Sequence, residues 1–470
     1  MLFSSTTFLY LFLPLVLFFY FVVFKKSRLF QNIFLLIASL IFYAWGEPKF
    51  VFIMILSIVV NWLTGLIISK THQCKTISKL LIIFNIVFNI GLLFIFKYLA
   101  FTGNIINKVF QLNLSIPTIL LPIGISFFTF QAISYVVDVY RHNGQVQTNI
   151  LYVGLYISFF PQLIAGPIVR YETISNEIKN RNETLDDFLN GFARFIVGLS
   201  KKVLLANSFA IVADQSFNAV ADRNNISVMF GWLGAIAYTF QIFFDFGGYS
   251  DMAIGLGRMF GFHFLENFNY PYISTSITEF WRRWHISLGT WFRDYLYIPL
   301  GGNRCSKYRN IFNLFIVWFL TGVWHGANFT FIVWGLMYFI LLVLEKLTGF
   351  YKYKKLKFFK WLYTIFFVLI GWVFFRSESI SDAVLYLKIM FGLNENAFVD
   401  GLFTGWFTQN IVLIFIGILL STPLFKYISQ KTINNTLFDW IRVISRIILF
   451  ILSVASLLSN SYNPFIYFNF

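Results

Sequence analysis

A histidine in the middle of an apolar, membrane-length run is the first residue of this sequence that could do chemistry. His325 lies in WFLTGVWHGANFTFIVWG, residues 318–335, where Gly322, Gly326 and Asn328 also interrupt regular helix packing. Hydrocarbon cannot solvate an ionisable group, and irregular backbone at membrane depth is tolerated only where protein or water surrounds it. The run therefore predicts a reaction centre inside a bilayer.

A second histidine, His285, belongs to a polar block with the sequence NFNYPYISTSITEFWRRWHISLGTWFRDYLYIPLGGNR, residues 267–304. A hydroxyl side chain at positions 274–276 is expected to cap a helix that runs through this histidine. Trp281 and His285 are four residues apart, so they would share one face of that helix. Together with the tight PLGG turn, this face favours a functional site that includes His285.

The same block is rich in arginine, and its charges have two interpretations. In the first, the block is an interfacial helix with snorkelling arginines and an aromatic belt. In the second, the arginines bind an anionic donor molecule while His285 lines the path to the reacting atoms. The donor-binding residues in this second interpretation are Arg282, Arg283 and Arg293.

Two acids interrupt another apolar segment, FFDFGGYSDMAIGLGRMFG, residues 243–261. Asp245 and Asp251 are costly within or beside a membrane span, so each is expected to have a partner such as a buried Arg or a substrate hydroxyl. The glycines of this segment would let helices approach closely. A glycine-packed helix with an ion-paired acid explains the segment as well as a functional site does. Its incomplete GxGxxG pattern follows no strand and predicts no dinucleotide site.

The residue types limit the chemistry to histidine acting as a base. The five histidines lack HxxxH spacing, and the sequence contains no metal-ligand pattern, GxSxG elbow or catalytic-cysteine signature. A histidine base takes a proton from a hydroxyl at ambient pH with little tuning of its pKa. Apolar walls would limit hydrolysis of an activated acyl donor. The sequence therefore predicts transfer of an acyl group to a hydroxyl, without a metal.

Composition places these residues in a polytopic membrane protein. Of the 470 residues, 58% are hydrophobic and only 12% are charged, and the sequence contains 63 Phe and 13 Trp. The net charge of +16 belongs to loops on the cytoplasmic side, since the basic residues are scattered between apolar runs and form no nucleic-acid patch. Two cysteines cannot form a disulfide scaffold. We expect one integral membrane domain over residues 1–470, with its polar catalytic core at about 231–335.

Apolar runs predict about eleven transmembrane helices. The first is followed by Lys25, Lys26 and Arg28, which indicates a retained span with its N-terminus outside. Residues 151–169, with Pro161 and Pro167, predict a broken or re-entrant segment. The predicted runs are residues 8–24, 30–45, 50–69, 80–96, 116–137, 228–246, 311–323, 329–344, 361–375, 411–420 and 443–458.

Two further segments complete this outline. Residues 188–214 mix basic residues with an apolar face, which suits an interfacial amphipathic helix. Residues 311–344 are too long for one crossing and predict two apolar legs with WHGAN at the turn. His325 would then lie inside or beyond the membrane midplane, reached from the cytoplasm through a tunnel.

At these residues the sequence resembles the membrane-bound O-acyltransferase family, and within it the branch of bacterial polysaccharide and peptidoglycan O-acetyltransferases typified by alginate O-acetylation membrane proteins. The resemblance covers nearly the whole chain. It is carried by LPIGISFFTFQAISYVVDVYR, FFPQLIAGPIVR, FFDFGGYSDMAIGLGRMFGF, EFWRRWHISLGTWFRDYLYIPLGGNR, GVWHGANFTFIVWG and the closing NPFIYFNF. It implies an all-α fold with transmembrane, re-entrant and interfacial helices around a central tunnel.

The resemblance also implies roles for particular residues. His325 corresponds to the essential histidine of the family and His285 to the second histidine of the polar block. Acetyl-CoA is the implied cytoplasmic donor, and the acetyl group would pass across the bacterial cytoplasmic membrane to a polysaccharide, directly or through an extracytoplasmic partner acetyltransferase. Residues matching the tunnel wall are Tyr249, Asp251, Trp281, Trp324 and Asn328.

Two alternatives remain open. The first is D-alanyl transfer to teichoic acids from a carrier-protein thioester, although the PLGGNR turn and the PFIYF-type tail fit the acetyl branch better. The second, from a different class, is a proton-coupled transporter or flippase that uses Asp245, Asp251 and His325 as a proton relay. A transporter usually has paired repeats with interrupted helices in both halves, and no such repeat is visible in this sequence.

Overall fold

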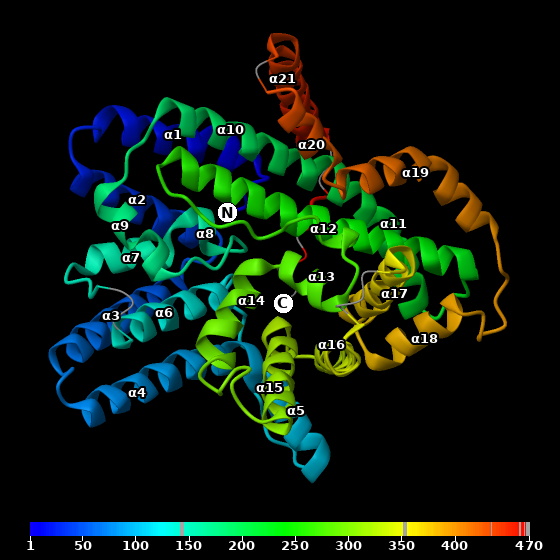
Figure 1. Ribbon diagram of the computed structural model, residues 1–470, viewed down its shortest axis with the longest axis horizontal. Coiled ribbons are helices and arrows are strands. Elements are labelled where there is room, and N and C mark those ends of the chain that lie inside the picture. Colours follow the sequence, from blue (N-terminus) through cyan, green and yellow to red (C-terminus); the bar gives the residue numbers. More distant parts are fainter. Residues whose placement is uncertain (142–144, 351–354, 434, 460–461, 465, 467–470) are drawn as a thin grey trace. The chain divides into compact units, whose positions relative to one another are not determined.

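The computed structural model consists of helices joined by loops (Figure 1). It describes residues 1–470 except 142–144, 351–354, 434, 460–461, 465 and 467–470. None of the described residues forms a strand. The all-α architecture predicted from the sequence is confirmed.

The described residues form two compact units, which we treat separately. The first comprises Met1–Phe195 and Tyr249–Leu265, and the second comprises Ile196–Gly248 and Glu266–Phe470. Two long helices, α10 (Leu185–Ser200) and α12 (Val228–Met259), contribute residues to both units.

The first unit is built from consecutive helices, some of which contain π-helical turns (η). In chain order they are η1 (Phe8–Phe12), α1 (Leu13–Phe18), η2 (Phe19–Val23), α2 (Arg28–Ala44), α3 (Val51–Lys70), α4 (Lys75–Leu93), η3 (Phe94–Tyr98), α5 (Leu99–Phe110), α6 (Ile125–Tyr140), α7 (Ile150–Ser158), α8 (Phe160–Leu163) and α9 (Tyr171–Asn180). Helix α6 packs against α3 and α4 and is buried along almost its whole length.

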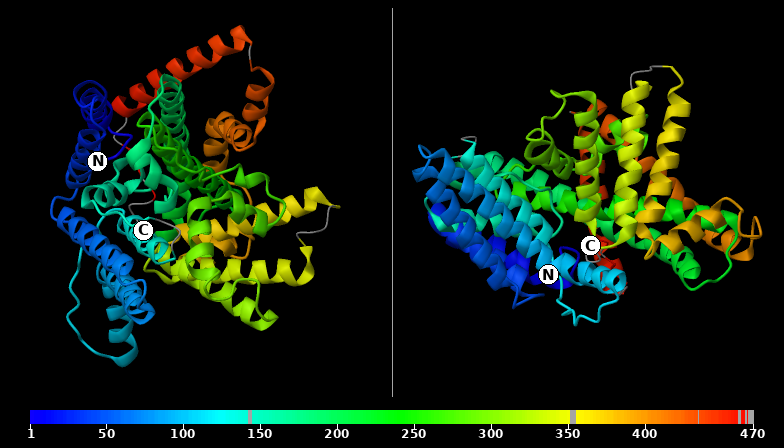
Figure 2. Two further views of the ribbon diagram at one scale, coloured as in Figure 1. Left: turned by 60° about the vertical axis from the view of Figure 1, so that its left-hand side comes forward. Right: turned by 90° about the horizontal axis from the view of Figure 1, so that it is seen from below.

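The second unit holds both candidate histidines. In chain order its remaining elements are η4 (Lys201–Ala206), α11 (Asn207–Ala221), the short 3₁₀ helix η5 (Pro271–Ile273), α13 (Ile277–Arg283), α14 (Ile286–Phe292), η6 (Arg293–Tyr297), α15 (Lys307–His325), α16 (Phe329–Thr348), α17 (Lys357–Arg376), α18 (Ile380–Met390), α19 (Gly401–Leu420), α20 (Leu424–Lys431) and α21 (Thr436–Ser459). Helix α16 packs between α15 and α17, and the three run side by side in both views of Figure 2.

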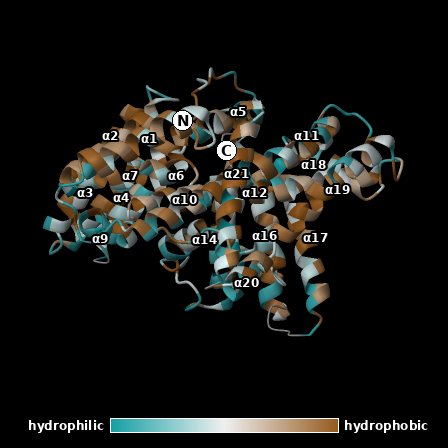
Figure 3. Cartoon of the chain, turned by 90° about the horizontal axis from the view of Figure 1, so that it is seen from above, coloured by the Kyte–Doolittle hydropathy of each residue, from teal (hydrophilic) through white to brown (hydrophobic). Residues whose placement is uncertain are grey.

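Eight of the described helices are long and apolar enough to cross a membrane, and three shorter apolar helices accompany them. Colouring by hydropathy shows brown along most helices and teal mainly in the connecting loops (Figure 3). Helices α19 and α21 have only 6% of their most apolar windows buried within the protein, as expected for helices that face lipid. The chain is a multi-pass membrane protein.

In two segments the structure differs from what the sequence predicts. The predicted span over residues 116–137 is wrong in its first third, because the helix begins only at Ile125. Pro117 and Pro122 lack the N–H that a helix needs, and Gly124 adopts a left-handed φ of +75° at the N-cap.

Residues 188–214 belong to a continuous helical stretch, Leu185–Ala221, whose most apolar window is 67% buried. The stretch is therefore not the interfacial helix that the sequence predicts. An interfacial helix would hold its basic side chains at the membrane surface, whereas two basic side chains of this stretch have acidic partners within the protein. Arg194 pairs with Asp251 in the first unit and Lys202 pairs with Asp245 in the second. The predicted break in residues 151–169 is confirmed, since α7 ends before Phe159 and α8 is a single short turn.

Candidate functional site

The WHGAN segment is the turn of a tight helical hairpin, as the sequence predicts. Helix α15 ends at His325, and α16 begins at Phe329 with Asn328 as its N-cap, whose side-chain oxygen accepts from the Thr330 N–H at 3.1 Å. The two legs approach closely because of glycine: a Cβ on Gly322 would lie 2.5 Å from the Phe331 carbonyl oxygen. The backbone around His325 is therefore fixed by packing that larger residues would not permit.

His325 is buried among aromatic rings, with 4% of its surface exposed. The rings of Trp324, Trp334 and Phe375 have centroids 5.0, 5.0 and 5.1 Å from that of the imidazole, at interplanar angles between 75° and 82°. These edge-to-face contacts hold the imidazole in an apolar surrounding that excludes bulk water. Phe375 comes from the last turn of α17, so three helices position this one side chain.

His285 adopts a different local structure from the one predicted. The expected helix through residues 279–285 is wrong, because α13 ends at Arg283 and Trp284 is extended. His285 then takes a left-handed conformation, φ +46°, as the N-cap of α14. A non-glycine residue in this region stores local strain, which is tolerated where surrounding contacts fix it. Trp281 and His285 therefore do not share a helix face.

A dense set of hydrogen bonds fixes this strained histidine. The Asn267 side-chain oxygen accepts from the Ser287 N–H at 3.2 Å and from the Ser287 hydroxyl at 2.8 Å, and it lies 3.1 Å from Nδ1 of His285. Ser287 donates two hydrogen bonds to this Asn267 atom, so the atom is the amide oxygen and can only accept. Nδ1 of His285 must therefore carry a proton and donate it to that oxygen. Nε2 is then a lone-pair acceptor, and it has no hydrogen-bond partner among the described residues.

Burial also determines the charge of His285, which lies outside the helices that qualify as membrane spans. Only 2% of its surface is exposed, and burial lowers the pKa of His285 to about 3. The imidazole therefore stays neutral at physiological pH. It can accept a hydrogen bond at Nε2, but its low pKa makes it a weak base.

Trp324 brings the two histidines into one site. Its ring centroid lies 5.0 Å from that of His325 and 6.1 Å from that of His285. Phe246 packs perpendicular to His285 from α12, at 4.6 Å. Two histidines forty positions apart, one in the polar block and one in the apolar run, thus meet around a single indole.

Trp281 lies on the other side of this aromatic cluster. Its ring is 5.4 Å from Trp334 and 4.9 Å from Tyr338, both on α16. Helix α13 is held there by Ser276, the N-cap residue whose hydroxyl accepts from the Glu279 N–H at 3.0 Å, and by the buried Glu345 of α16. The carboxylate of Glu345 accepts from the Ile277 and Thr278 N–H groups at 2.6 and 2.9 Å, where a helix N-terminus favours an anion. The hydroxyl cap predicted from the sequence is confirmed at Ser276.

The three arginines of the polar block have different surroundings. Arg283 donates to Glu279 at 3.0 Å and to the Asn269 carbonyl at 3.0 Å, and Arg293 donates to Asp294 at 2.6 Å. Arg282 is exposed. Donor binding by Arg282, Arg283 and Arg293 stays a prediction.

Tyr249 and Asp251 belong to the first unit, where each has a partner. The Tyr249 ring stacks on Phe3 at 4.6 Å, and Asp251 accepts from Arg194 at 2.8 Å. The partner predicted for an acid at this position is confirmed. The tunnel-wall role of these two residues stays a prediction.

Three buried residues of the site were not identified from the sequence. They are Asn267, which orients His285; Trp334, which contacts His325; and Glu345, which anchors α13. An intramembrane glutamate at the end of an apolar run was a signal for the last of them. The other two have no local signature, because a lone Asn or Trp is common in membrane proteins.

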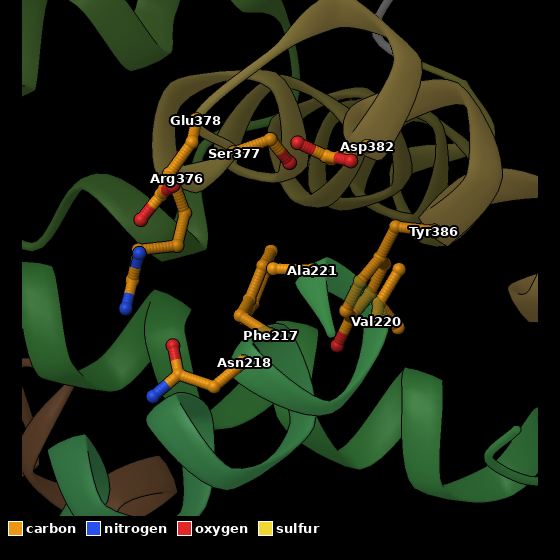
Figure 4. Close-up of a pocket in the computed structure, with 9 residues that line it drawn as sticks. All are labelled: Phe217, Asn218, Val220, Ala221, Arg376, Ser377, Glu378, Asp382 and Tyr386. Atoms are coloured by element: carbon orange, nitrogen blue, oxygen red, sulfur yellow. The ribbon is translucent and has the colours of Figure 1, made fainter. Parts of the chain in front are cut away.

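A small polar hollow lies next to this cluster in the second unit. Figure 4 shows Arg376, Glu378 and Asn218 on one side of it and Asp382 and Tyr386 on the other. Arg376 directly follows Phe375, the ring that contacts His325, and the Asn328 side-chain amide donates to the Glu378 carbonyl at 2.6 Å. None of the site residues predicted from the sequence lines this hollow.

Within the described ranges no group of three or more His, Cys, Asp or Glu side chains is arranged to hold a metal ion. The arrangement around Trp324 instead provides two imidazoles in an apolar enclosure, which suits proton transfer from a hydroxyl. A sequence model of the membrane-bound O-acyltransferase family matches residues 145–380, the segment that contains both histidines.

Relatives with named activities cover the whole chain. The probable alginate O-acetylase AlgI of Pseudomonas putida is 39% identical over 100% of both chains. The peptidoglycan O-acetyltransferase of Helicobacter pylori is 33% identical over 100% of this chain and 98% of its own. The teichoic acid D-alanyltransferase of Bacillus subtilis is 31% identical over only 47% of this chain and 58% of its own. The chain therefore belongs to the membrane-bound O-acyltransferase family and is an acyltransferase.

Proposed function

We propose that the protein moves an acetyl group from acetyl-CoA in the cytoplasm to an extracytoplasmic polysaccharide, directly or through a partner acetyltransferase. The observation that carries this proposal is the pair of buried histidines around Trp324, inside the segment shared with the acyltransferase family. His325 acts as the general base. The membrane concerned would be the bacterial cytoplasmic membrane.

Each histidine has a separate part in this mechanism. His325 takes the proton of the acceptor hydroxyl as its oxygen attacks the acyl carbon, and returns that proton to the departing thiolate. His285, neutral and with a free lone pair on Nε2, accepts a hydrogen bond that orients the hydroxyl. The aromatic walls exclude water, so that the acyl group is transferred and not hydrolysed.

The remaining predicted residues surround this pair. Arg282, Arg283 and Arg293 would hold the phosphates of the donor, and Arg282 and Arg293 are exposed. Trp281, Trp324 and Asn328 would line the path of the acyl group near His325, and Tyr249 and Asp251 would line the tunnel elsewhere. Phosphate binding by the arginines would make donor affinity depend on salt concentration.

The extent of similarity supports acetyl transfer over D-alanyl transfer. The acetyltransferase relatives match the full length of this chain, whereas the D-alanyltransferase relatives match 47% of it. A transporter receives no support from the acids of the proposed proton relay. Asp245 is bound to Lys202 at 2.7 Å and Asp251 to Arg194 at 2.8 Å, so neither is arranged as a free proton carrier.

The direct cellular test replaces His325 by Ala and follows acetyl esters on cell-wall and secreted glycans. We expect the acetyl esters to disappear while the protein remains inserted at its normal level, because the substitution removes the imidazole and leaves the apolar legs of the hairpin unchanged. His263→Ala is the matched control, since His263 is half exposed and pairs with Glu177. Acetylation at the wild-type level in the His325→Ala strain would refute the proposal, and loss of an alanyl ester would favour D-alanyl transfer.

A further inference from the structure

Several buried hydrogen-bond donors beside His325 have no acceptor among the described residues. They are the indole N–H groups of Trp281 and Trp334 and the hydroxyl of Tyr338. The three rings contact one another, with centroids between 4.9 and 5.4 Å apart. Buried polar groups are normally satisfied in native proteins, so a group of unsatisfied donors in one place requires a physical explanation.

Other indoles of the same unit are satisfied by the backbone. Trp361 donates to the Tyr272 carbonyl at 2.9 Å, and Trp232 donates to the Met390 carbonyl at 2.8 Å. The fold can therefore provide an acceptor where an indole has only a packing role. The donors beside His325 differ because no acceptor for them lies among the described residues.

Trp334 has the most constrained position of these donors. It is fully buried, and its ring meets that of His325 at 5.0 Å and 82°. Phe375 and Tyr338 pack against it at 5.2 and 5.3 Å. Its neighbour Gly335 lies so close to α15 that an added Cβ would be 2.5 Å from the Trp318 carbonyl oxygen. The indole N–H thus has a fixed position relative to the histidine.

An indole N–H is a donor only, so it requires an acceptor atom, and an oxygen that arrives with a ligand can supply one. In the proposed acyl transfer, the oxygen that reaches the site and gains negative charge is the carbonyl oxygen of the thioester. We infer that Trp334 donates its Nε1–H to this oxygen and stabilises the oxyanion of the tetrahedral intermediate. This inference rests on the proposed function and adds a catalytic residue to it.

The step is balanced in atoms and electrons. The acceptor oxygen forms a bond to the acyl carbon while His325 takes the hydroxyl proton, and the carbonyl π electrons move to oxygen, where the Trp334 N–H meets them. The carbonyl then re-forms, the carbon–sulfur bond breaks, and the thiolate takes the proton from His325. The products are an ester and a free thiol, and Trp334 is unchanged.

The test measures release of free CoA from acetyl-CoA by the purified full-length enzyme in lipid nanodiscs, with a soluble oligosaccharide as acceptor. Two replacements at position 334 remove the N–H: Trp334→Phe, and benzothienylalanine, in which sulfur replaces the ring N–H with nearly the same shape. We expect kcat to fall about 10²–10³-fold with KM for acetyl-CoA changed less than about 3-fold, as for loss of one oxyanion donor. Trp361→Phe is the matched control, which loses an indole N–H bonded to the backbone and should keep wild-type kcat.

A second readout reports the hydrogen bond itself. With ¹³C-labelled acetyl-CoA bound to the His325→Asn enzyme, donation from Trp334 should lower the infrared stretching frequency of the thioester carbonyl, and benzothienylalanine at 334 should raise it again. The inference is overturned if benzothienylalanine leaves kcat within about 3-fold of wild type, or if neither the rate nor the carbonyl frequency differs from the Trp361→Phe control. A wild-type enzyme inactive on acetyl-CoA but active on a D-alanyl carrier thioester would refute only the proposed donor, and the same variants would then be compared on that thioester.

Discussion

Two buried polar clusters of the second unit are built on opposite principles. In the cluster around Asp245, every charge has partners: one carboxylate oxygen lies 2.7 Å from Lys202 Nζ and the other accepts from the Ile466 N–H at 3.0 Å. Lys202 also donates to the side-chain oxygen of Asn207 at 3.0 Å and to the carbonyl of Pro464. In the cluster around His325, buried donors of Trp281, Trp334 and Tyr338 and the acceptor Nε2 of His285 have no partner among the described residues.

This difference indicates a structural role for the cluster around Asp245 and a ligand-binding role for the cluster around His325. A buried ion pair is tolerable when its remaining hydrogen-bonding capacity is used within the protein, and the Asp245 cluster meets this condition. Unsatisfied buried groups raise the free energy of the folded state unless a substrate or water completes them. Both clusters interrupt apolar helices, so their sequences look alike. The charges around Asp245 are paired within the protein, whereas the donors and the acceptor around His325 have no partner among the described residues.

The largest expected effect is a loss of stability when the ion pair between Asp245 and Lys202 is broken. Asp245→Asn should lower the free energy of unfolding by about 3–5 kcal/mol, because it leaves the Lys202 ammonium buried without a counter-charge. Thermal unfolding of the enzyme in one detergent measures this effect, and the rate of acyl transfer per folded molecule should stay close to that of wild type. A stable but inactive Asp245→Asn protein would instead place this acid in the chemistry.

The matched control removes both charges of that pair. Replacing Lys202 by Met and Asp245 by Leu together should recover most of the lost stability, since well-packed apolar residues often replace a buried ion pair without cost. If the double variant were less stable than Asp245→Asn, the pair would be stabilising in itself.

A smaller effect, on kcat, is expected at Asn267, which orients His285 beside the cluster around His325. Asn267→Ala removes the oxygen that accepts from Nδ1 of His285, so the proton can move to Nε2 and the orienting acceptor is lost. We expect kcat to fall about 10-fold with little change in KM, the lower end of the effects seen when a group that orients a histidine is removed. Steady-state kinetics of CoA release measures both constants. Unchanged kcat in a folded Asn267→Ala protein would remove His285 from the mechanism.

The smallest effect concerns pH. Because burial lowers the pKa of His285 to about 3, the unfolded chain binds a proton near pH 6.5 that the folded protein does not bind. The free energy of unfolding therefore loses nothing to His285 above about pH 6.5 and decreases as the pH falls from 6.5 toward 3. Between pH 6.5 and 5.5 the loss is about 1 kcal/mol, and His285→Gln should remove it from the pH dependence of the melting temperature. An identical pH slope in the variant would mean that His285 has the same pKa in the folded and the unfolded protein, which contradicts the lowered pKa.

The parts of the site that follow from local patterns were predictable. Glycines and Asn328 between two apolar legs predicted the hairpin turn at His325, and the prolines near residue 161 predicted the broken segment. The left-handed conformation of His285 was not predictable, because no glycine marks the end of α13. An i, i+4 argument assumes a continuous helix and fails where the chain turns.

Partners that are distant in sequence were the other missing part. Asp245 required a cation, but that it is Lys202, forty-three positions earlier, depends on how α12 packs against η4. The same holds for Asn267 and His285, which are joined across eighteen positions. Burial of a polar residue predicts that a partner exists, and only the three-dimensional structure identifies it.

The most direct test of the central claim compares turnover per folded molecule for His325→Gln and wild type, both purified in nanodiscs and supplied with acetyl-CoA and an oligosaccharide acceptor. The account predicts that His325→Gln keeps its melting temperature within a few degrees and loses at least about 10²-fold in release of CoA, the effect expected for removal of a general base. A His325→Gln enzyme that turns over at the wild-type rate would contradict this claim, because acyl transfer would then not depend on the cluster around His325.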